Sequence, residues 1–197
     1  MEELTPELVG LVLSQVDLVS RVACRFVCTT WMRASPPLPP RSVIKQTCAH
    51  AAEQGHLAVL QWARTNGCPW DEWTCANASK EGHLEVLQWA RTNGCPWSEW
   101  TCYLAAQGGH LEVLQWAHAN GCPAWDQSTC RVAAMGGHLE VLQWARANGC
   151  PWDKHICALA ASRGHLEVLQ WAQANGCPWD EKTCALSNAA EDLDVFL

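Results

Sequence analysis

One phrase recurs along this chain and restricts its fold more than any other feature. The triplet Gly-His-Leu occurs five times, followed by near-identical runs such as GHLEVLQWARTNGCPW at residues 82–97. The copies begin at Gly55, Gly82, Gly109, Gly137 and Gly164, so the steps between them are 27, 27, 28 and 27 residues. The longer step holds one inserted residue, Ala124, which marks a loop because loops absorb length changes. A fixed period of this size predicts a solenoid.

Each copy contains two helical patterns. The second, HLEVLQWAR at residues 83–91, has apolar residues over more than half of its helical wheel. It ends at NGCP, where Gly94 suits a left-handed position and Pro96 cannot continue a helix. The first pattern, TCYLAAQ at residues 101–107, is short and rich in small side chains. Since no stretch alternates with period 2, we expect an all-α, right-curving solenoid whose stacked helix pairs bury one another.

The repeated unit resembles the ankyrin repeat. The run AAQGGHLEVLQWAHANGC at residues 105–122 follows the family pattern AAxxGHxxVVxxLLxxGA almost position by position. The resemblance extends over residues 43–197, as five full units and a sixth that stops within its second helix. The family period is about 33 residues, so the resemblance implies that the β-hairpin fingers are shortened or absent here. Short-connector arrays of this kind are common in large DNA viruses, which implies a viral protein acting in a host cell.

A second resemblance lies in residues 1–34, which a Pro-rich spacer at residues 35–42 separates from the array. This segment, LTPELVGLVLSQVDLVSRVACRFVCTTW from its fourth residue, resembles the F-box. The resemblance implies helices that bind a Skp-type linker subunit of a cullin–RING ubiquitin ligase. The residues implied in that contact are Leu4, Pro6, Leu8, Val12, Leu13, Val16, Val27 and Trp31. The alternative is that these helices only cap the first repeat, since solenoids require capped ends.

Charge and composition exclude several classes of function. A formal net charge of −7 disfavours binding to nucleic acid or to a membrane surface. No Gly-rich phosphate loop, nucleophile elbow or unrepeated acidic pair occurs, so we expect neither an enzyme nor a cofactor. The 13 cysteines are odd in number, and the acidic N-terminus lacks a basic signal region. Reduced thiols in the cytoplasm, or in the host cytoplasm or nucleus for a viral protein, are therefore expected rather than secretion.

The repeated histidines and cysteines raise metal binding as an alternative. Stacked helices lie about 8–10 Å apart, whereas zinc–nitrogen bonds measure about 2.1 Å. Successive histidines therefore cannot share a metal, and we expect each to bond the backbone at the start of its second helix. Cysteines such as Cys68 and Cys75 lie seven apart, wider than usual zinc spacing. We interpret them as small buried hydrophobes, whereas a metal-binding protein would retain stoichiometric zinc on purification.

Positions that differ between the copies are the candidate binding residues. They fall on the first helix of each unit, and aromatic residues and arginine among them are of the type enriched at interface hot spots. The predicted target-binding residues are Trp73, Trp100, Tyr103, Arg131, Met135 and His155. Neutral variation on a solvated face is the alternative, because surface positions are weakly constrained.

These features predict a monomeric adaptor without catalytic residues. The F-box-like segment would bind the Skp-type subunit, and the array would hold a target protein near the ligase. The rival hypothesis is a free-standing ankyrin-type binding scaffold whose N-terminal helices act only as a cap. The sequence does not identify the target protein, because a fold does not determine which ligand its surface binds.

Overall fold

The computed structural model describes residues 47–65, 67–123 and 126–179. The F-box-like segment, the Pro-rich spacer and the sixth unit lie outside these ranges. Within them the chain forms ten helices and no strand, as two series. The first helices are α5 (Thr47–Glu53), α7 (Glu72–Lys80), α9 (Glu99–Gly108), α11 (Gln127–Gly136) and α13 (Lys154–Ser162). The second helices are α6 (Leu57–Thr65), α8 (Leu84–Thr92), α10 (Leu111–Ala119), α12 (Leu139–Ala147) and α14 (Leu166–Ala174).

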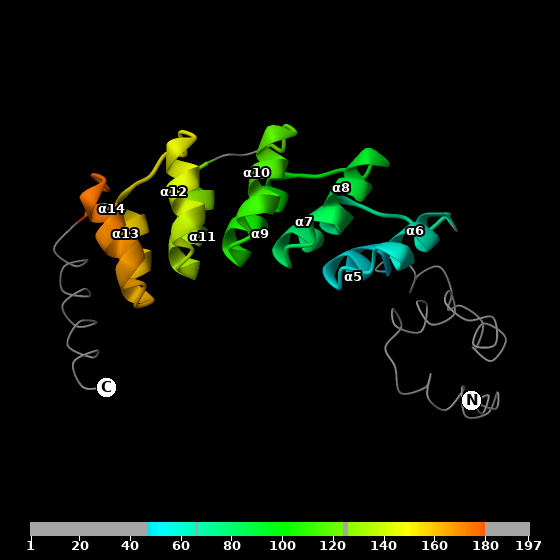
Figure 1. Ribbon diagram of the computed structural model, residues 1–197, viewed down its shortest axis with the longest axis horizontal. Coiled ribbons are helices and arrows are strands. Elements are labelled where there is room, and N and C mark those ends of the chain that lie inside the picture. The colour runs from blue at the N-terminus through cyan, green and yellow to red at the C-terminus, as the bar shows by residue number, and fades with distance from the viewer. Residues whose placement is uncertain (1–46, 66, 124–125, 180–197) are drawn as a thin grey trace, which may run out of the picture.

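The five helix pairs stand side by side in a row that bends into an arc (Figure 1). Each first helix packs on the first helices of the neighbouring units and on the second helix of its own unit. The connectors between units run along the upper, outer edge of the arc in Figure 1. The predicted all-helical stack of ankyrin-like pairs is therefore confirmed. None of the helices in the described ranges is long and apolar enough to cross a membrane.

Small side chains explain why successive first helices pack so closely. On α9, Cys102, Ala105 and Ala106 are buried, and the other first helices bury cysteine and alanine at the same places, except that Ser79 replaces the second alanine on α7. The second helices supply the bulk of the core through one fully buried leucine each: Leu60, Leu87, Leu114, Leu142 and Leu169. Truncating such a leucine to alanine typically costs about 2–5 kcal/mol, so each unit is anchored by its own leucine.

Sequence signals at both ends fix the length of the first helices. Asp71 caps α7 by accepting a hydrogen bond from the backbone N–H of Trp73 at 3.1 Å. Asp126 and Asp153 cap α11 and α13 in the same way. At the other end, Gly109 adopts a left-handed conformation with φ 77°, which a residue with a side chain adopts only with strain. The chain then reverses directly into the second helix.

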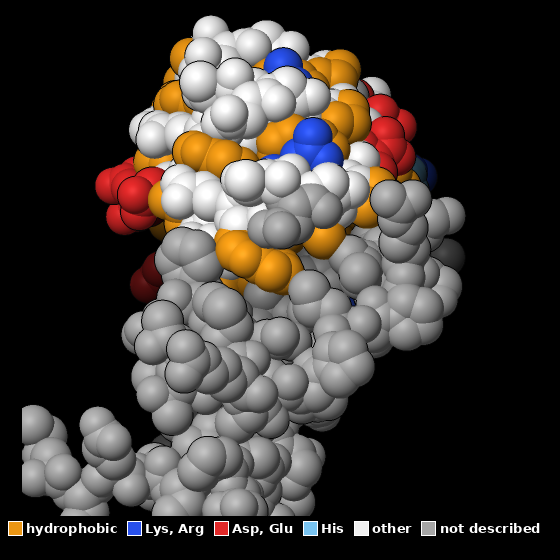
Figure 2. Space-filling model, turned by 90° about the vertical axis from the view of Figure 1, so that its right-hand side faces the viewer, with side chains coloured by type: hydrophobic (Ala, Val, Ile, Leu, Met, Phe, Trp, Pro, Cys, Tyr) orange, Lys and Arg blue, Asp and Glu red, His pale blue; other side chains and the backbone are white. Residues whose placement is uncertain are grey.

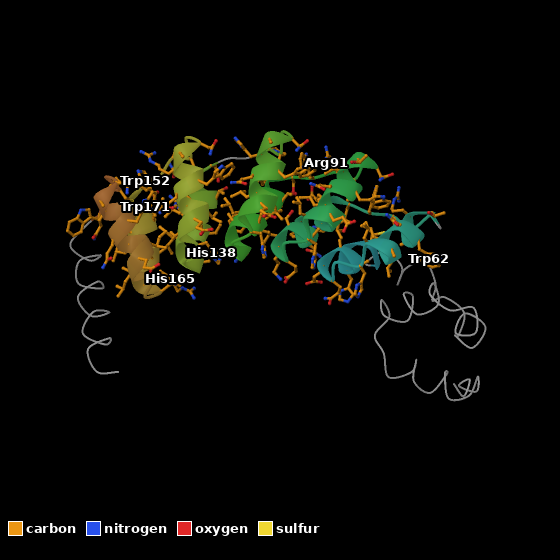
Figure 3. All side chains as sticks on the ribbon, in the orientation of Figure 1. Trp62, Arg91, His138, Trp152, His165 and Trp171 are labelled. Atoms are coloured by element: carbon orange, nitrogen blue, oxygen red, sulfur yellow. The ribbon has the colours of Figure 1, made fainter. Side chains whose placement is uncertain are left out.

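Three connectors in the described ranges contribute a tryptophan that links two units: Trp70, Trp97 and Trp152. The ring of Trp97 lies edge-to-face with Trp116 of the next second helix, with centroids 5.9 Å apart. The guanidinium of Arg91 lies 4.1 Å from the Trp97 centroid and donates to the carbonyl oxygen of Cys95. The same contact joins Trp152 to Trp171, which lie close together in Figure 3. Edge-to-face contacts between tryptophans thus link a connector to the next second helix. The described connectors themselves contain no strand.

The tryptophans of the second helices are half-buried and do not belong to the fully buried core. They pack against the core from its edge, and their positions are Trp62, Trp89, Trp116, Trp144 and Trp171. The physical reason is that valine and leucine of the same helix, Val86 and Leu87 on α8, already fill the interface. The larger indole therefore lies at the margin, where a connector tryptophan covers part of Trp89, Trp116 and Trp171.

Candidate protein-binding surface

All six residues predicted to bind a target lie on first helices. Trp73 lies on α7, Trp100 and Tyr103 on α9, Arg131 and Met135 on α11, and His155 on α13. We call this set the first-helix ridge. The structure brings five of them into two groups, an aromatic group at one end and a charged group at the other. Met135 lies between these groups, where it lines a hollow.

The aromatic group consists of three rings in contact. Trp73 and Trp100 stack with centroids 6.0 Å apart and an interplanar angle of 24°. Tyr103 meets Trp100 edge-on, with centroids 5.3 Å apart. Trp73 is 45% exposed and Trp100 is 40% exposed, so both indoles present large apolar surface to solvent. Tryptophan is rarely exposed to this extent without a partner, and such surface is typical of interaction sites.

The charged group centres on Asp153, which sequence reasoning did not select. Arg131 forms an ion pair with this carboxylate, and Nδ1 of His155 lies 3.0 Å from it. The Arg131 guanidinium, with smaller contributions from the His155 contacts, lowers the pKa of Asp153 to about 2. Arg131 also donates to the side-chain oxygen of Gln127 at 3.2 Å. The guanidinium is therefore already engaged by neighbours on its own chain.

Two hollows lie on either side of Tyr103. One, of about 140 Å³, is lined by Glu99, Trp100, Tyr103, Asp126, Ser128 and Thr129. The other, of about 280 Å³, is lined by Tyr103, Ser128, Arg131, Val132, Met135 and Leu159. Small-molecule sites usually measure about 300–1,000 Å³, so the first hollow is well below this range and the second lies just under its lower end.

Several residues of the hollows were missed by sequence reasoning. Val132 and Leu159 occupy the same repeat position, three residues after the Thr or Ile that precedes each first-helix cysteine. The earlier units carry Asn77 and Leu104 there, so variation at this position was an available signal. Glu99 lies before the expected first pattern, which began at Thr101, whereas α9 begins at Glu99; Asp126 likewise caps α11.

Four of the five repeated histidines bond the backbone, as predicted. Nε2 of His110 donates to the backbone carbonyl oxygen of Lys80 in the preceding unit at 2.9 Å. His83, His138 and His165 make the corresponding bonds to Glu53, Gln107 and Met135 at 2.9–3.0 Å. Figure 3 shows His138 and His165 on the lower side of the arc, away from the connectors. Among the described residues, no three His, Cys, Asp or Glu side chains are grouped to hold a metal ion.

The cysteines form pairs within each unit, with a register that the sequence did not suggest. Cys75 on the first helix meets Cys95 at the end of the second, twenty residues later rather than seven. A hydrogen bond with Cys95 together with burial raises the pKa of the Cys75 thiol. The ten cysteines in the described ranges are free, and nine of them are buried. Their interpretation as small core residues is confirmed.

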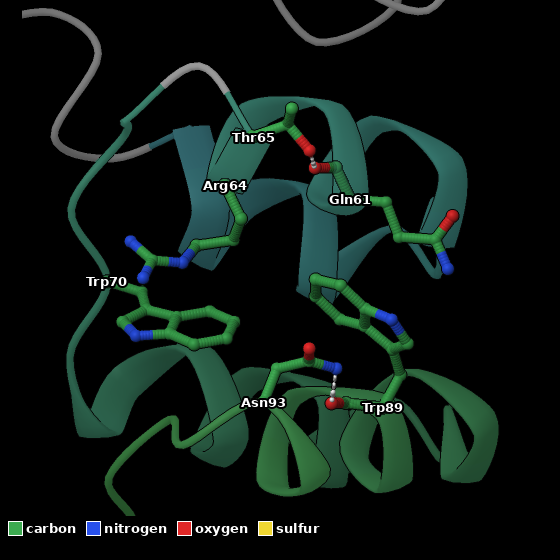
Figure 4. Close-up of a pocket in the computed structure, with 6 residues that line it drawn as sticks. All are labelled: Gln61, Arg64, Thr65, Trp70, Trp89 and Asn93. Atoms are coloured by element: carbon green, nitrogen blue, oxygen red, sulfur yellow. Dashed lines mark hydrogen bonds between the residues drawn. The ribbon is translucent and has the colours of Figure 1, made fainter.

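A third hollow lies between second helices (Figure 4). It measures about 350 Å³ and is lined by Gln61, Arg64, Thr65, Trp70, Trp89 and Asn93. Figure 4 shows the Arg64 guanidinium over Trp70, 4.0 Å from its centroid, and Asn93 bonded to the Trp89 carbonyl oxygen. The same arginine–tryptophan contact recurs at Arg91 and Arg146. Because this contact is repeated, we interpret it as part of the packing between units and not as a binding site specific to one unit.

The residues predicted to contact the Skp-type subunit lie outside the described ranges.

Figure 2 views the molecule from the end that carries α5 and α6. In the coloured part of that face, apolar and uncharged surface predominates, with a few basic side chains near its centre and acidic side chains toward its two sides.

Comparison with protein-family models matches two parts of the chain. The model of the F-box domain matches residues 1–37. The model of ankyrin repeats in many copies matches residues 102–146, which extend from α9 into α12. A search of curated proteins finds no match to the chain. Both matched families are protein-interaction modules, and the chain therefore carries an F-box domain followed by ankyrin repeats.

Proposed function

We propose that the chain is a target adaptor of a cullin–RING ubiquitin ligase. The F-box domain binds a Skp-type linker subunit, and the ankyrin array holds a target protein within reach of the ligase. The observation that carries this proposal is the F-box match at residues 1–37, placed ahead of an array with exposed aromatic residues. The ligase supplies the chemistry of ubiquitin transfer, and the adaptor contributes binding alone.

The first-helix ridge is the surface we assign to the target. Its exposed indoles at Trp73 and Trp100 are the two largest apolar groups on the first helices that remain open to solvent. Aromatic residues with surrounding side-chain-sized hollows are the usual anchors of protein interfaces. Much of the array is repeated from unit to unit, whereas several positions of this ridge vary between units and so can specify one partner.

The proposal implies a monomer that acts where the ligase is found, in the cytoplasm or nucleus. In the case of a viral origin, that compartment belongs to the host cell. The residues assigned to the Skp-type subunit remain those expected from the F-box pattern, with Leu8 and Trp31 as apolar anchors near the two ends of the motif.

Binding of the purified full chain to a Skp-type subunit, measured by isothermal titration calorimetry, tests the proposal. The parent is expected to bind with a dissociation constant of about 1 µM or tighter, near −8 kcal/mol. A variant with Leu8→Asp and Trp31→Ala should lose binding at unchanged helicity by circular dichroism. A Trp73→Ala, Trp100→Ala variant serves as the matched control and should bind normally. A folded parent that fails to bind would instead support the plain ankyrin scaffold with a helical cap.

A further inference from the structure

The smaller hollow beside Tyr103 combines aromatic walls with acidic rims. Trp100 and Tyr103 of α9 form one wall, and buried Thr129 of α11 lies opposite. Glu99 and Asp126 are exposed and line the same hollow. Aromatic faces attract cations through their quadrupole, and carboxylates attract them by charge. The hollow therefore has the composition that receives the end of a lysine or arginine side chain.

The local charge balance favours a cation even after the helix ends are considered. The N-termini of α9 and α11 adjoin the hollow, and each carries about half a positive charge from the helix dipole. Two carboxylates outweigh these two half-charges and leave about one negative charge. Glu99 makes no hydrogen bond or ion pair with any of the described residues, so its charge is available. The net charge of −7 acts in the same direction over longer distances.

The nearby arginine does not reverse this preference. The Arg131 guanidinium is held by Asp153 and Gln127, and an acidic ligand would have to displace both partners. Asp71 and Glu72 are further acidic residues at the N-terminus of α7, the first helix of the preceding unit. An acidic peptide would therefore meet repulsion along most of this edge, whereas a basic peptide would meet attraction.

The lining of the larger hollow indicates which type of side chain would lie next to the basic one in a bound segment. Val132, Met135 and Leu159 give it an apolar lining, and Tyr103 and Ser128 are shared with the smaller hollow. We propose that the ridge binds a protein segment with a lysine or arginine side chain between Trp100, Tyr103, Glu99 and Asp126, and a neighbouring aliphatic side chain over Met135 and Leu159. This inference rests on the proposed function of the array as the target-binding module, and it names the chemistry of the target.

The test begins with a random twelve-residue peptide library displayed on phage and selected against the purified full chain. Selected peptides are expected to share a lysine or arginine close to an aliphatic residue. The affinity of one such peptide is then measured by fluorescence anisotropy, beside a copy with norleucine in place of the basic residue. The norleucine copy should bind at least about threefold more weakly, because exposed ion pairs and cation–π contacts each contribute modestly.

Three variants locate the site. Glu99→Gln and Tyr103→Ala should each lower the affinity for the basic peptide by about two- to fivefold. Glu112→Gln is the matched control: it removes the same charge from an exposed position on α10, in the other helix layer, and should leave the affinity unchanged. Circular dichroism checks that every variant keeps the parent helicity.

Several results would overturn the inference. Selection of acidic or uncharged peptides would do so, as would selection of no peptide at all. Basic peptides bound equally by the Glu99→Gln and parent chains would show only general attraction to an acidic protein. Binding of the Skp-type subunit is measured on the same preparations. If it persists while basic peptides are not selected, the adaptor proposal stands without this target chemistry; the opposite pattern leaves a peptide-binding array without the ligase.

Discussion

The imidazole of His110 reaches the backbone carbonyl oxygen of Lys80, thirty residues earlier, with a hydrogen bond of 2.9 Å. The carbonyl oxygen can only accept, so Nε2 carries the proton and the tautomer of this histidine is fixed. The same ring covers Gly82, where an added Cβ would lie 2.5 Å from the ring nitrogen Nδ1. In the pair Gly82-His83, the glycine therefore packs against the histidine of the following unit, whereas the histidine bonds the preceding unit.

The first prediction compares two glycines with almost the same backbone conformation. Gly82 and Gly94 have φ of 78° and 81°, but only Gly82 is covered by a histidine ring. Gly94→Ala should cost about 1–2 kcal/mol from left-handed strain alone. Gly82→Ala should cost about 1–3 kcal/mol more, because the new methyl group must also displace His110. Urea unfolding followed by far-ultraviolet circular dichroism measures both free energies of unfolding.

The histidine itself supplies the control for that comparison. In a His110→Ala background the ring is absent, so Gly82→Ala should cost only as much as Gly94→Ala. His110→Ala alone should destabilise by about 1–3 kcal/mol, because it leaves the Lys80 carbonyl oxygen without this donor. Equal costs for Gly82→Ala and Gly94→Ala in the parent chain would show that the ring does not restrict the glycine.

The second prediction concerns the connector tryptophans. Trp97→Ala removes both the contact with Trp116 and the surface under Arg91, and should destabilise by about 2 kcal/mol. Arg91→Lys keeps the charge but loses the planar stack, so a smaller loss of about 0.5–1 kcal/mol is expected. Trp179 occupies the same connector position but is 52% exposed, and Trp179→Ala should change stability by less than about 0.5 kcal/mol. Thermal unfolding of the three variants would be inconsistent with this ranking if Trp179→Ala were as damaging as Trp97→Ala.

The third prediction concerns thiol reactivity. Cys122 is partly exposed, whereas the other nine cysteines of the described ranges are buried. A hydrogen bond from Cys102 lowers the pKa of Cys122, and the same contact raises the pKa of Cys102. Iodoacetamide added to the native chain should therefore alkylate Cys122 first among these ten and Cys102 much later. Peptide mass spectrometry over a time course gives the order, with Cys122→Ser as the control for assignment; equal rates at the two sites would contradict it.

The fourth prediction uses the lowered pKa of Asp153. A carboxyl whose pKa falls from 3.8 to about 2 on folding contributes stability above the higher value, and loses it as the pH falls toward the lower. Asp153→Asn keeps a good helix cap but removes the ion pair with Arg131. The variant should be less stable by about 1 kcal/mol or less near neutral pH, because both side chains are partly exposed.

The pH dependence distinguishes this ion pair from a simple loss of packing. Since Asp153 is protonated in both states below its folded pKa, the parent and Asp153→Asn chains should converge in stability between about pH 4 and pH 2. Urea midpoints measured across that interval provide the test. A difference that stays constant with pH would assign the effect to the cap and not to the charge.

The repeat in the sequence was sufficient to predict the helix pairs, because apolar spacing and the glycine–proline stops are local signals. The first turn of α9 was missed: the prediction began at Thr101, whereas the helix begins at Glu99. Ser98 and the aspartates at its repeat position were available as capping residues. Glu99 and Trp100 therefore both lie in the first turn of α9, so Glu99 is adjacent to the first-helix ridge.

The cysteine register and the hollows could not be predicted in the same way. Two antiparallel helices bring the start of the first next to the end of the second, so Cys75 meets Cys95 and not its nearer neighbour Cys68. The hollows depend on side chains from successive units that differ, such as Tyr103 on α9 and Leu159 on α13. The repeat period reveals the features that all units share. The hollows form where the units differ, so the period does not predict them.

The histidine bonds between units have one further consequence, because every acceptor in the described array is a main-chain oxygen. The residues that provide this oxygen are Glu53, Lys80, Gln107 and Met135, and their side chains have nothing in common. Any amino acid other than one that breaks the helix offers the same carbonyl group. Specificity can therefore change by substitution at these positions while adhesion between the units stays constant, so that a single scaffold can be retargeted during evolution without being rebuilt.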